Sequence, residues 1–125
     1  MTKETKKTVV LGASTNPNRY AYLAAHRLHE AGHPMELVSI KKGQLFGQQF
    51  KDLKELPEIN EVDTVTLYIG SHNLTQWNDY ILNLEPKRII FNPGTENQAL
   101  AQAARAKGIE TIEGCTLVML RAGLF

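Results

Sequence analysis

A disulfide framework is excluded at once, because the chain has a single cysteine, Cys115. Charge of one sign is also scarce. The formal net charge is +1 over 125 residues, whereas nucleic-acid binding needs a concentrated basic face. No apolar run reaches the roughly 18 residues of a membrane span, and the first residues lack the apolar centre of a signal peptide. We therefore expect a cytoplasmic protein that binds neither nucleic acid nor membrane.

Signatures of the common enzyme classes are missing as well. The sequence has no P-loop, no nucleophile elbow and no paired acid and base at a known spacing. His26 and His29 share a helical pattern, but spacing suggests no third ligand, so we expect no metal site. Only His72 and Cys115 stand where they could face a ligand, and Cys115 is better explained as a small packing residue. We identify no catalytic residue and expect a binding function rather than an enzymatic one.

What the sequence does contain is a regular alternation of short apolar runs and helical patterns. Its 42% apolar and 22% charged residues are those of an ordinary globular domain. Alternating strands and helices predict a parallel sheet with right-handed crossovers. The expected fold class is a Rossmann-like, doubly wound α/β sheet of five strands in the order 3-2-1-4-5, in a single domain over residues 1–125. Strands are expected at residues 7–11, 35–40, 63–69, 88–91 and 109–112, helices at 20–31, about 71–84 and 99–107, and either state at 115–120.

The loop after the first strand carries the strongest functional signal. Gly12 lets the backbone turn tightly and approach a phosphate, and the following helix start offers free N–H groups with a partial positive charge. Short polar side chains and the guanidinium of Arg19 add further donors. A plain turn with a surface arginine is the competing interpretation. We favour phosphate binding because this loop opens the first βα unit. The expected contacts are Gly12, Ala13, Ser14, Thr15, Asn16, Arg19 and Tyr20.

The loop after the second strand argues against NAD as the nucleotide. Only the first glycine of the G-x-G-x-x-G fingerprint is present, and the strand ends without the acidic residue that binds an adenosine ribose. Lys41 and Lys42 stand there instead and suit an additional ribose phosphate, although a solvated lysine pair is the commoner case. Two cofactors therefore stay open: coenzyme A, with its 3′-phosphate, and NADP, with its 2′-phosphate.

The loop after the fourth strand is expected to face the first. Ligands of such sheets bind beyond the carboxyl ends of the strands where the strand order reverses, which the expected order places between strands one and four. Asn92, Pro93, Gly94 and Thr95 form this loop, and Thr95 with Gln98 has the pattern of a helix capping box. A purely structural cap is the competing interpretation.

The loop after the third strand is a candidate cover for the ligand. Gly70 in this loop would permit close approach. The adenine would rest against apolar residues of the crevice, for which Ile40 and Ile69 are the candidates. A simple turn with a helix cap at Ser71 or Asn73 explains the same residues equally well.

Three segments together resemble a known family. They are residues 9–20, which begin Val9-Val10-Leu11-Gly12-Ala13-Ser14, residues 89–96 (Ile-Ile-Phe-Asn-Pro-Gly-Thr-Glu) and residues 115–120 (Cys-Thr-Leu-Val-Met-Leu). These segments resemble those of the small stand-alone CoA-binding proteins, which are similar to the N-terminal CoA-binding domain of the succinyl-CoA synthetase alpha subunit. The resemblance covers essentially the whole chain. Family members often carry a serine where this chain has Ala21, so one contact is expected to be absent.

This resemblance implies a Rossmann-like fold and coenzyme A bound through residues 12–19, with contributions from residues 40–43, 68–71 and 92–96. The larger synthetase subunit also has a second domain with a phosphorylatable histidine. Nothing in this chain corresponds to that residue, so ligase activity is not implied.

The function we expect is non-catalytic binding of coenzyme A or an acyl-CoA. Backbone N–H groups of residues 13–16 and Arg19 would hold the diphosphate, and Lys41 or Lys42 the 3′-phosphate. One alternative is an NADP- or other nucleotide-dependent enzyme. Another is the cofactor-binding subunit of a multi-chain CoA enzyme. The apolar ending Leu124-Phe125 also leaves open a homodimer, beside an unidentified enzyme partner.

Overall fold

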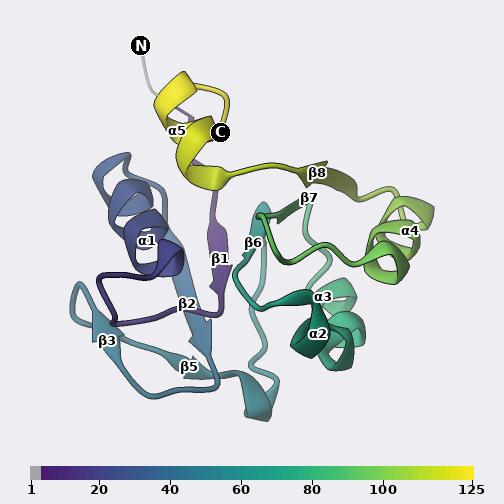
Figure 1. Ribbon diagram of the computed structural model, residues 1–125, viewed down its shortest axis with the longest axis horizontal. Coiled ribbons are helices and arrows are strands. Elements are labelled where there is room, and N and C mark those ends of the chain that lie inside the picture. Colours follow the sequence, from purple (N-terminus) through teal and green to yellow (C-terminus); the bar gives the residue numbers. More distant parts are fainter. Residues whose placement is uncertain (1–3) are drawn as a thin grey trace.

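The computed structural model describes residues 4–125, whose central feature is a parallel sheet with helices on both faces (Figure 1). The strand order is β5-β2-β1-β6-β7-β8, and every neighbouring pair is parallel. A separate antiparallel hairpin joins β3 and β4. The expected domain also included residues 1–3, which lie outside the described residues. The strands are β1 (Thr8–Leu11), β2 (Met35–Ser39), β3 (Gln44–Leu45), β4 (Gln48–Gln49), β5 (Lys51–Asp52), β6 (Thr64–Leu67), β7 (Arg88–Phe91) and β8 (Glu110–Glu113).

The expected Rossmann-like α/β class is confirmed, but the expected strand number and order were wrong. All five expected strands form, and a sixth, β5, pairs two of its residues with the end of β2. The expected third strand, β6, therefore lies beside β1 instead of beyond β2. Every residue of β6 is buried, which suits a central position in a parallel sheet. With β5 counted as the third strand, the order becomes 3-2-1-4-5-6.

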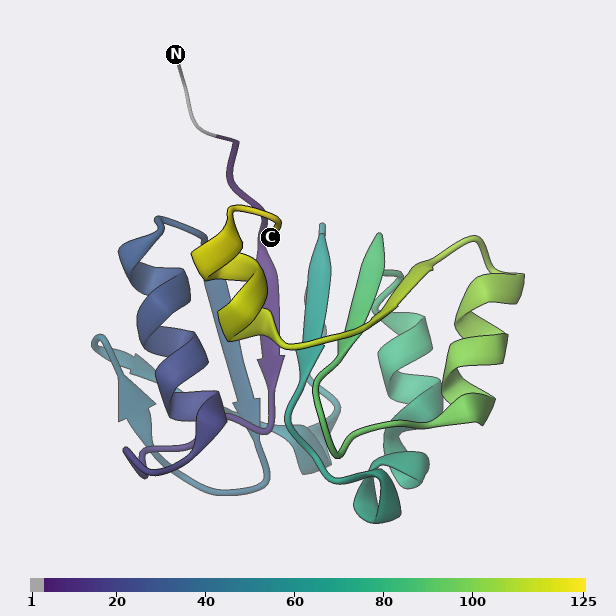
Figure 2. The same cartoon turned by 45° about the horizontal axis from the view of Figure 1, so that its top comes forward.

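The helices divide between the two faces of the sheet (Figure 2). Helices α1 (Tyr20–Glu30) and α5 (Thr116–Ala122) lie side by side on one face and contact each other. The opposite face is covered by α2 (Ser71–Leu74), η2 (Thr75–Trp77), α3 (Asn78–Asn83) and α4 (Gln98–Ala106), while the short η1 (Leu53–Glu55) follows β5. The helix expected at 71–84 is thus broken into three pieces, and no side chain caps its start. The segment expected at 115–120 as helix or strand is α5.

The two faces of the sheet differ in polarity. Toward α3 and α4, alternate strand residues such as Val65 and Phe91 build the larger apolar core. Toward α1 and α5, Val10 and Leu37 pack on α1, but β6 and β7 present buried polar groups. These polar groups are Thr64, Thr66 and Arg88. Because buried polar groups need partners, this face requires a hydrogen-bond network around α5.

Candidate functional site

The point where the strand order reverses lies between β1 and β6. After β1 the chain adds β2 and then β5 on one side, and it returns to place β6 on the other side of β1. Ligands of open α/β sheets bind at such a reversal, beyond the carboxyl ends of the strands. The expected order placed this reversal between β1 and β7, and that part of the expectation was wrong. The loop after β6 flanks the crevice, and β7 is one strand farther away.

Gly12 is the contact point between the loops after β1 and β6. Its φ is +101°, and a Cβ built on it would lie 2.9 Å from the carbonyl carbon and oxygen of Tyr68. The Tyr68 amide also donates to the Leu11 carbonyl at 2.8 Å. Only glycine combines this backbone conformation with so close an approach. The tight turn predicted at Gly12 thus brings the first loop against the β6 loop.

The loop from residue 13 to residue 19 is braced by its own polar groups. The Asn16 amide donates to Ser14 Oγ, and the Asn18 amide donates to Asn16 Oδ1, both at 3.0 Å. The Ala13 amide donates to the Val38 carbonyl at 3.1 Å, so it is not one of the expected free donors. Arg19 is the N-cap residue of α1, but its side chain makes no capping bond and is exposed.

Four backbone amides remain as donors at the entrance to α1. Among residues 4–125, the amides of Ser14, Thr15, Tyr20 and Ala21 have no hydrogen-bond acceptor. The first N–H groups of a helix point along its axis beyond its start and carry a partial positive charge. The free donors therefore gather at the first loop, where an anion can replace the missing acceptors.

The segment after β2 lies directly against the first loop. A Cβ built on Gly43 would be 2.7 Å from the Thr15 Cγ2 atom and 2.8 Å from a Phe50 ring carbon, so both side chains pack directly on the Gly43 backbone. Lys41 and Lys42 are exposed, and 56% of the Ile40 surface is exposed as well. The structure therefore brings two free cations and an exposed apolar side chain to the edge of the first loop. The other adenine candidate, Ile69, is half-buried and packs against the core.

Asn92 and Thr95 hold the loop after β7 in place. The Asn92 side chain is 2% exposed. Its Nδ2 donates to Thr66 Oγ1 at 2.7 Å and to the Leu67 carbonyl at 2.8 Å, and its Oδ1 accepts from the Thr116 amide at 2.9 Å. The Thr95 hydroxyl donates to the Asn92 carbonyl at 2.7 Å. These side-chain groups are therefore engaged within the protein and fix the loop to β6 and α5.

The helix cap predicted at Thr95 was wrong. Helix α4 begins at Gln98, and its N-cap is Asn97, whose Oδ1 accepts from the Leu100 amide at 3.0 Å. Because the Thr95 hydroxyl is already bonded inside the loop, the first turn of the helix is capped two residues later.

Pro93 and Gly94 form the exposed tip of the same loop. The Gly94 amide donates to both carboxylate oxygens of Glu96 at 3.1 Å, and the Gly94 carbonyl accepts from the Ser71 amide at 3.0 Å. The loops after β6 and β7 are thus joined by a backbone hydrogen bond. The amide that points out of this tip already has an anionic acceptor.

Tyr68 borders the first loop, and sequence reasoning included it only within residues 68–71, which the resemblance implied, and not among the individual contact residues. Burial raises its pKa to about 12, and hydrogen bonding to Thr116 and Thr66 offsets this only in part. The half-buried Cys115 thiol lies near enough to raise the same pKa further. Its position was a further sequence signal, because Tyr68 directly follows β6, but the expected strand order moved β6 away from the first loop.

Neither residue considered for catalysis is arranged as an activated group. His72 is exposed in the short α2 helix, and Cys115 is the N-cap residue of α5. Within the described part of the chain, neither side chain makes a hydrogen bond. A nucleophile or general base needs a neighbouring group that activates or orients it, usually through a hydrogen bond.

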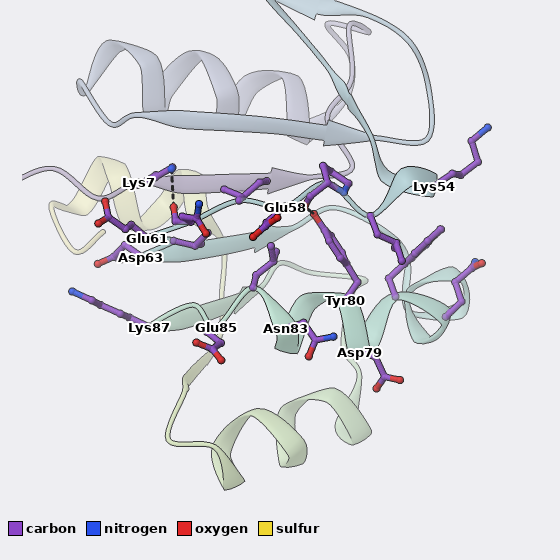
Figure 3. Close-up of a pocket in the computed structure, with 18 of the residues that line it drawn as sticks. Lys7, Lys54, Glu58, Glu61, Asp63, Asp79, Tyr80, Asn83, Glu85 and Lys87 are labelled. Carbon is purple, nitrogen blue, oxygen red and sulfur yellow. Dashed lines mark hydrogen bonds between the residues drawn. The ribbon is translucent and has the colours of Figure 1, made fainter.

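Two cavities border other parts of the molecule. One, of about 1090 Å³, lies at the amino ends of the strands, where Lys7, Asp63 and Lys87 precede β1, β6 and β7 (Figure 3). It shares no residue with the loops described above. The other, of about 950 Å³, lies between α1 and α5 and includes Tyr20 and Cys115 in its lining. None of the helices in residues 4–125 has the length and apolar content that crossing a bilayer takes.

Comparison with known proteins gives one family model and several similar structures. Residues 6–121 match a family model described as a CoA binding domain. A crystal structure of an uncharacterized protein is 52% identical and superimposes with a TM-score of 0.93, over 98% of this chain and 100% of that one. No protein of curated function matches this chain.

More distant structures share the fold. A hypothetical protein from Pyrococcus horikoshii OT3 is 20% identical, with a TM-score of 0.82 over 96% of this chain and 84% of that one. The dinucleotide forming acetyl-coenzyme A synthetase 1 of Ca. Korarchaeum cryptofilum, solved with phosphate and ADP, is 17% identical. Its TM-score is 0.72 over 87% of this chain and 25% of the enzyme.

Proposed function

This chain belongs to the family of CoA binding domains, and we propose that it binds coenzyme A or an acyl-CoA without catalysing a reaction on it. The observation that carries the proposal is the group of free amide donors at the entrance to α1, located at the reversal of the strand order. The two features coincide at Gly12, whose backbone lies close to the Tyr68 carbonyl.

The diphosphate would be held at the start of α1. The amides of Ser14 and Thr15 are the free donors of the loop, and those of Tyr20 and Ala21 are the free donors of the helix. The exposed guanidinium of Arg19 stands between the two pairs in the sequence and adds charge-assisted bonds. An anion here would satisfy the helix start, which no side chain of the protein caps.

The adenosine end would lie along the segment after β2. Lys41 and Lys42 would contact the 3′-phosphate, and the exposed Ile40 would cover one face of the adenine. The Gly43–Thr15 contact holds this segment at a fixed separation from the diphosphate loop. The exposed tip at Pro93 and Gly94 borders the opposite end of the ligand.

One observation favours a second candidate, a cofactor-binding subunit. The fold of this chain corresponds to a quarter of the Ca. Korarchaeum cryptofilum synthetase, so the same fold occurs as one part of a larger CoA enzyme. In that case the catalytic residues would come from another chain.

Calorimetric titration tests the ligand. Coenzyme A should bind more tightly than dephospho-CoA, and both should bind more tightly than NADP or NAD. The Lys41→Ala/Lys42→Ala double variant should bind the two CoA forms equally, because only the 3′-phosphate distinguishes them. Lys107→Ala, an exposed lysine beyond α4, is the control. Tightest binding to NADP would overturn the proposal.

The contact at Arg19 is tested separately. Arg19→Ala should weaken coenzyme A binding by about 1.5–3 kcal/mol, the range for a hydrogen bond to a charged group. Arg105→Ala, an exposed arginine of α4 on the opposite face, should leave the affinity unchanged. Equal affinities for the two variants would remove Arg19 from the site. Turnover of an acyl-CoA that appears only with a co-purified protein would establish the subunit function.

A further inference from the structure

We infer that the groove between α1 and α5 binds the acyl chain of an acyl-CoA, so that the protein selects medium-chain acyl-CoA over free coenzyme A. This inference rests on the proposed function and adds a ligand class to it. It depends on three properties of the groove: its apolar lining, its continuity with the first loop, and the aromatic and charged groups at its far end.

The groove is a cavity of about 950 Å³ that two neighbouring helices form along their length. Figure 2 shows α1 and α5 side by side on the same face of the sheet, and the two helices contact each other. Ligand pockets of proteins commonly occupy ~300–1000 Å³ and are lined mainly by apolar groups. The apolar side chains of this lining are Leu23 of α1 together with Leu117, Val118, Leu120 and Phe125.

Several of these apolar side chains have no cover. Leu23 is 38% exposed, Val118 is 49% exposed and Tyr20, at the mouth of the groove, is 71% exposed. Single exposed apolar residues are ordinary, but here three of them line one cavity. An alkyl chain in the groove would remove their surfaces from water, which is the chemistry that this lining suits best.

The mouth of the groove lies at the proposed CoA site. Tyr20 lines the groove, and its amide is one of the free donors at the entrance to α1. Cys115 lines the same cavity and lies beside Tyr68, which contacts Gly12. A thioester at this mouth would therefore continue directly from a diphosphate in the first loop into the groove.

Phe125 lines the far end of the groove. The Phe125 ring lies 4.4 Å from the Arg88 guanidinium carbon and 4.9 Å from the His33 ring centre, and its carbonyl accepts from Lys6 Nζ at 3.0 Å. From Tyr20 to Ala31 the helix rises by about 16 Å at 1.5 Å per residue. The charged residues of the lining, Glu4, Lys6, Arg27, Glu30 and Arg121, limit the length of its apolar part. The groove therefore has room for a chain of limited length, and we assign it to medium-chain acyl groups.

The test is calorimetric titration with coenzyme A, acetyl-CoA, butyryl-CoA and octanoyl-CoA. Affinity should rise with chain length, up to about fourfold for each fully buried methylene. Octanoyl-CoA should bind at least ~10-fold more tightly than acetyl-CoA, allowing for incomplete burial. Leu23→Asp and Val118→Asp place a charge in the groove without opening the core, since both positions are exposed. They should remove this chain-length dependence and leave the affinity for free coenzyme A unchanged.

Leu56→Asp is the matched control. Leu56 is 54% exposed and lines the cavity at the opposite edge of the sheet, so the same kind of replacement there should keep the dependence on chain length. If coenzyme A binds and all four ligands have equal affinity, the acyl groove is overturned while the proposed function stands. If coenzyme A itself does not bind, the proposed function fails. If wild type is a dimer, Leu23→Asp is a monomer and chain length has no effect, the groove is a subunit interface and the inference is wrong.

Discussion

Asn92 shows how one buried amide can hold a functional loop. Its side chain connects β6, the loop after β7 and the start of α5 by three hydrogen bonds. Sequence position suggested a ligand contact, but the sequence does not tell whether a polar side chain at a strand end faces outward or inward. The orientation depends on which elements pack on that face, and α5 could not be assigned as a helix beforehand.

Asn92→Ala should lower the free energy of unfolding by about 1–3 kcal/mol, because it leaves buried donors and acceptors of three elements without partners. Asn83→Ala is the control. Asn83 is exposed at the end of α3, so its removal should have little effect. Denaturant unfolding measures both variants. Equal stabilities of the two variants would contradict the structural function of Asn92.

A comparison of Gly12 and Gly32 distinguishes the cost of backbone strain from the cost of a steric clash. Both have positive φ, at +101° and +83°, but a Cβ at Gly12 meets the Tyr68 backbone at 2.9 Å and a Cβ at Gly32 meets nothing within 4 Å. Gly32→Ala should cost about 1–2 kcal/mol of stability from its left-handed conformation alone. Gly12→Ala should cost more than this and should also weaken coenzyme A binding. If denaturant unfolding finds equal losses in the two variants, the close contact with Tyr68 has no energetic weight.

At the scale of elements, the sequence predicts the longer segments well. Residues 20–31 have the apolar spacing of a helix, and α1 spans Tyr20–Glu30. Strand β5 and the β3–β4 hairpin were missed, because elements with strands of two residues show no periodicity. The missed β5 also explains the wrong strand order, since the place beside β2 was given to the next strand in the sequence. Because of that error, the reversal of the strand order was expected between β1 and β7 and not between β1 and β6.

The cap of α4 gives a test at this scale. Asn97→Ala should destabilise the protein by about 0.5–2 kcal/mol, because the Leu100 amide loses its acceptor. The loss also includes the bond from Asn97 Nδ2 to Asn78 Oδ1 at 2.9 Å, which joins α4 to α3. Gln98→Ala, at the first exposed position of the helix, should change stability little. Thermal unfolding distinguishes the two, and a larger loss for Gln98→Ala would contradict the assignment of the cap.

At the scale of the whole molecule, the raised pKa values of two tyrosines predict that the protein loses stability at high pH. Burial raises the pKa of Tyr68 and of Tyr80 to about 12 from the ordinary value of 10.0. Tyr80 also donates its hydroxyl proton to the Pro57 carbonyl at 2.6 Å. Both groups hold their protons more tightly in the folded state, so this contribution is fully present below pH 10. It is lost as pH rises from about 10 to 12, because the unfolded chain ionises first.

The measurement is denaturant unfolding at successive pH values through this window. The free energy of unfolding of wild type should fall more steeply than that of a Tyr68→Phe/Tyr80→Phe double variant, which lacks both hydroxyls. Lysine titration contributes equally to the two proteins, so the difference isolates the tyrosines. Parallel curves would show that neither hydroxyl is linked to folding.

The hydrogen bond from the Gly94 amide to the Glu96 carboxylate affects the orientation of a ligand on the sheet edge. The carboxylate of Glu96 accepts from the Gly94 amide at the tip of the β7 loop, so a phosphate at this amide would meet a negative charge. Across the crevice, Arg19, Lys41 and Lys42 present exposed cations after β1 and β2. Charge is therefore distributed unevenly along the carboxyl edge of the sheet, with positive side chains near β2 and a negative side chain near β7. We therefore expect a ligand that is anionic at one end and neutral at the other to align along this edge, with its phosphates at β2 and its uncharged arm pointing past β6.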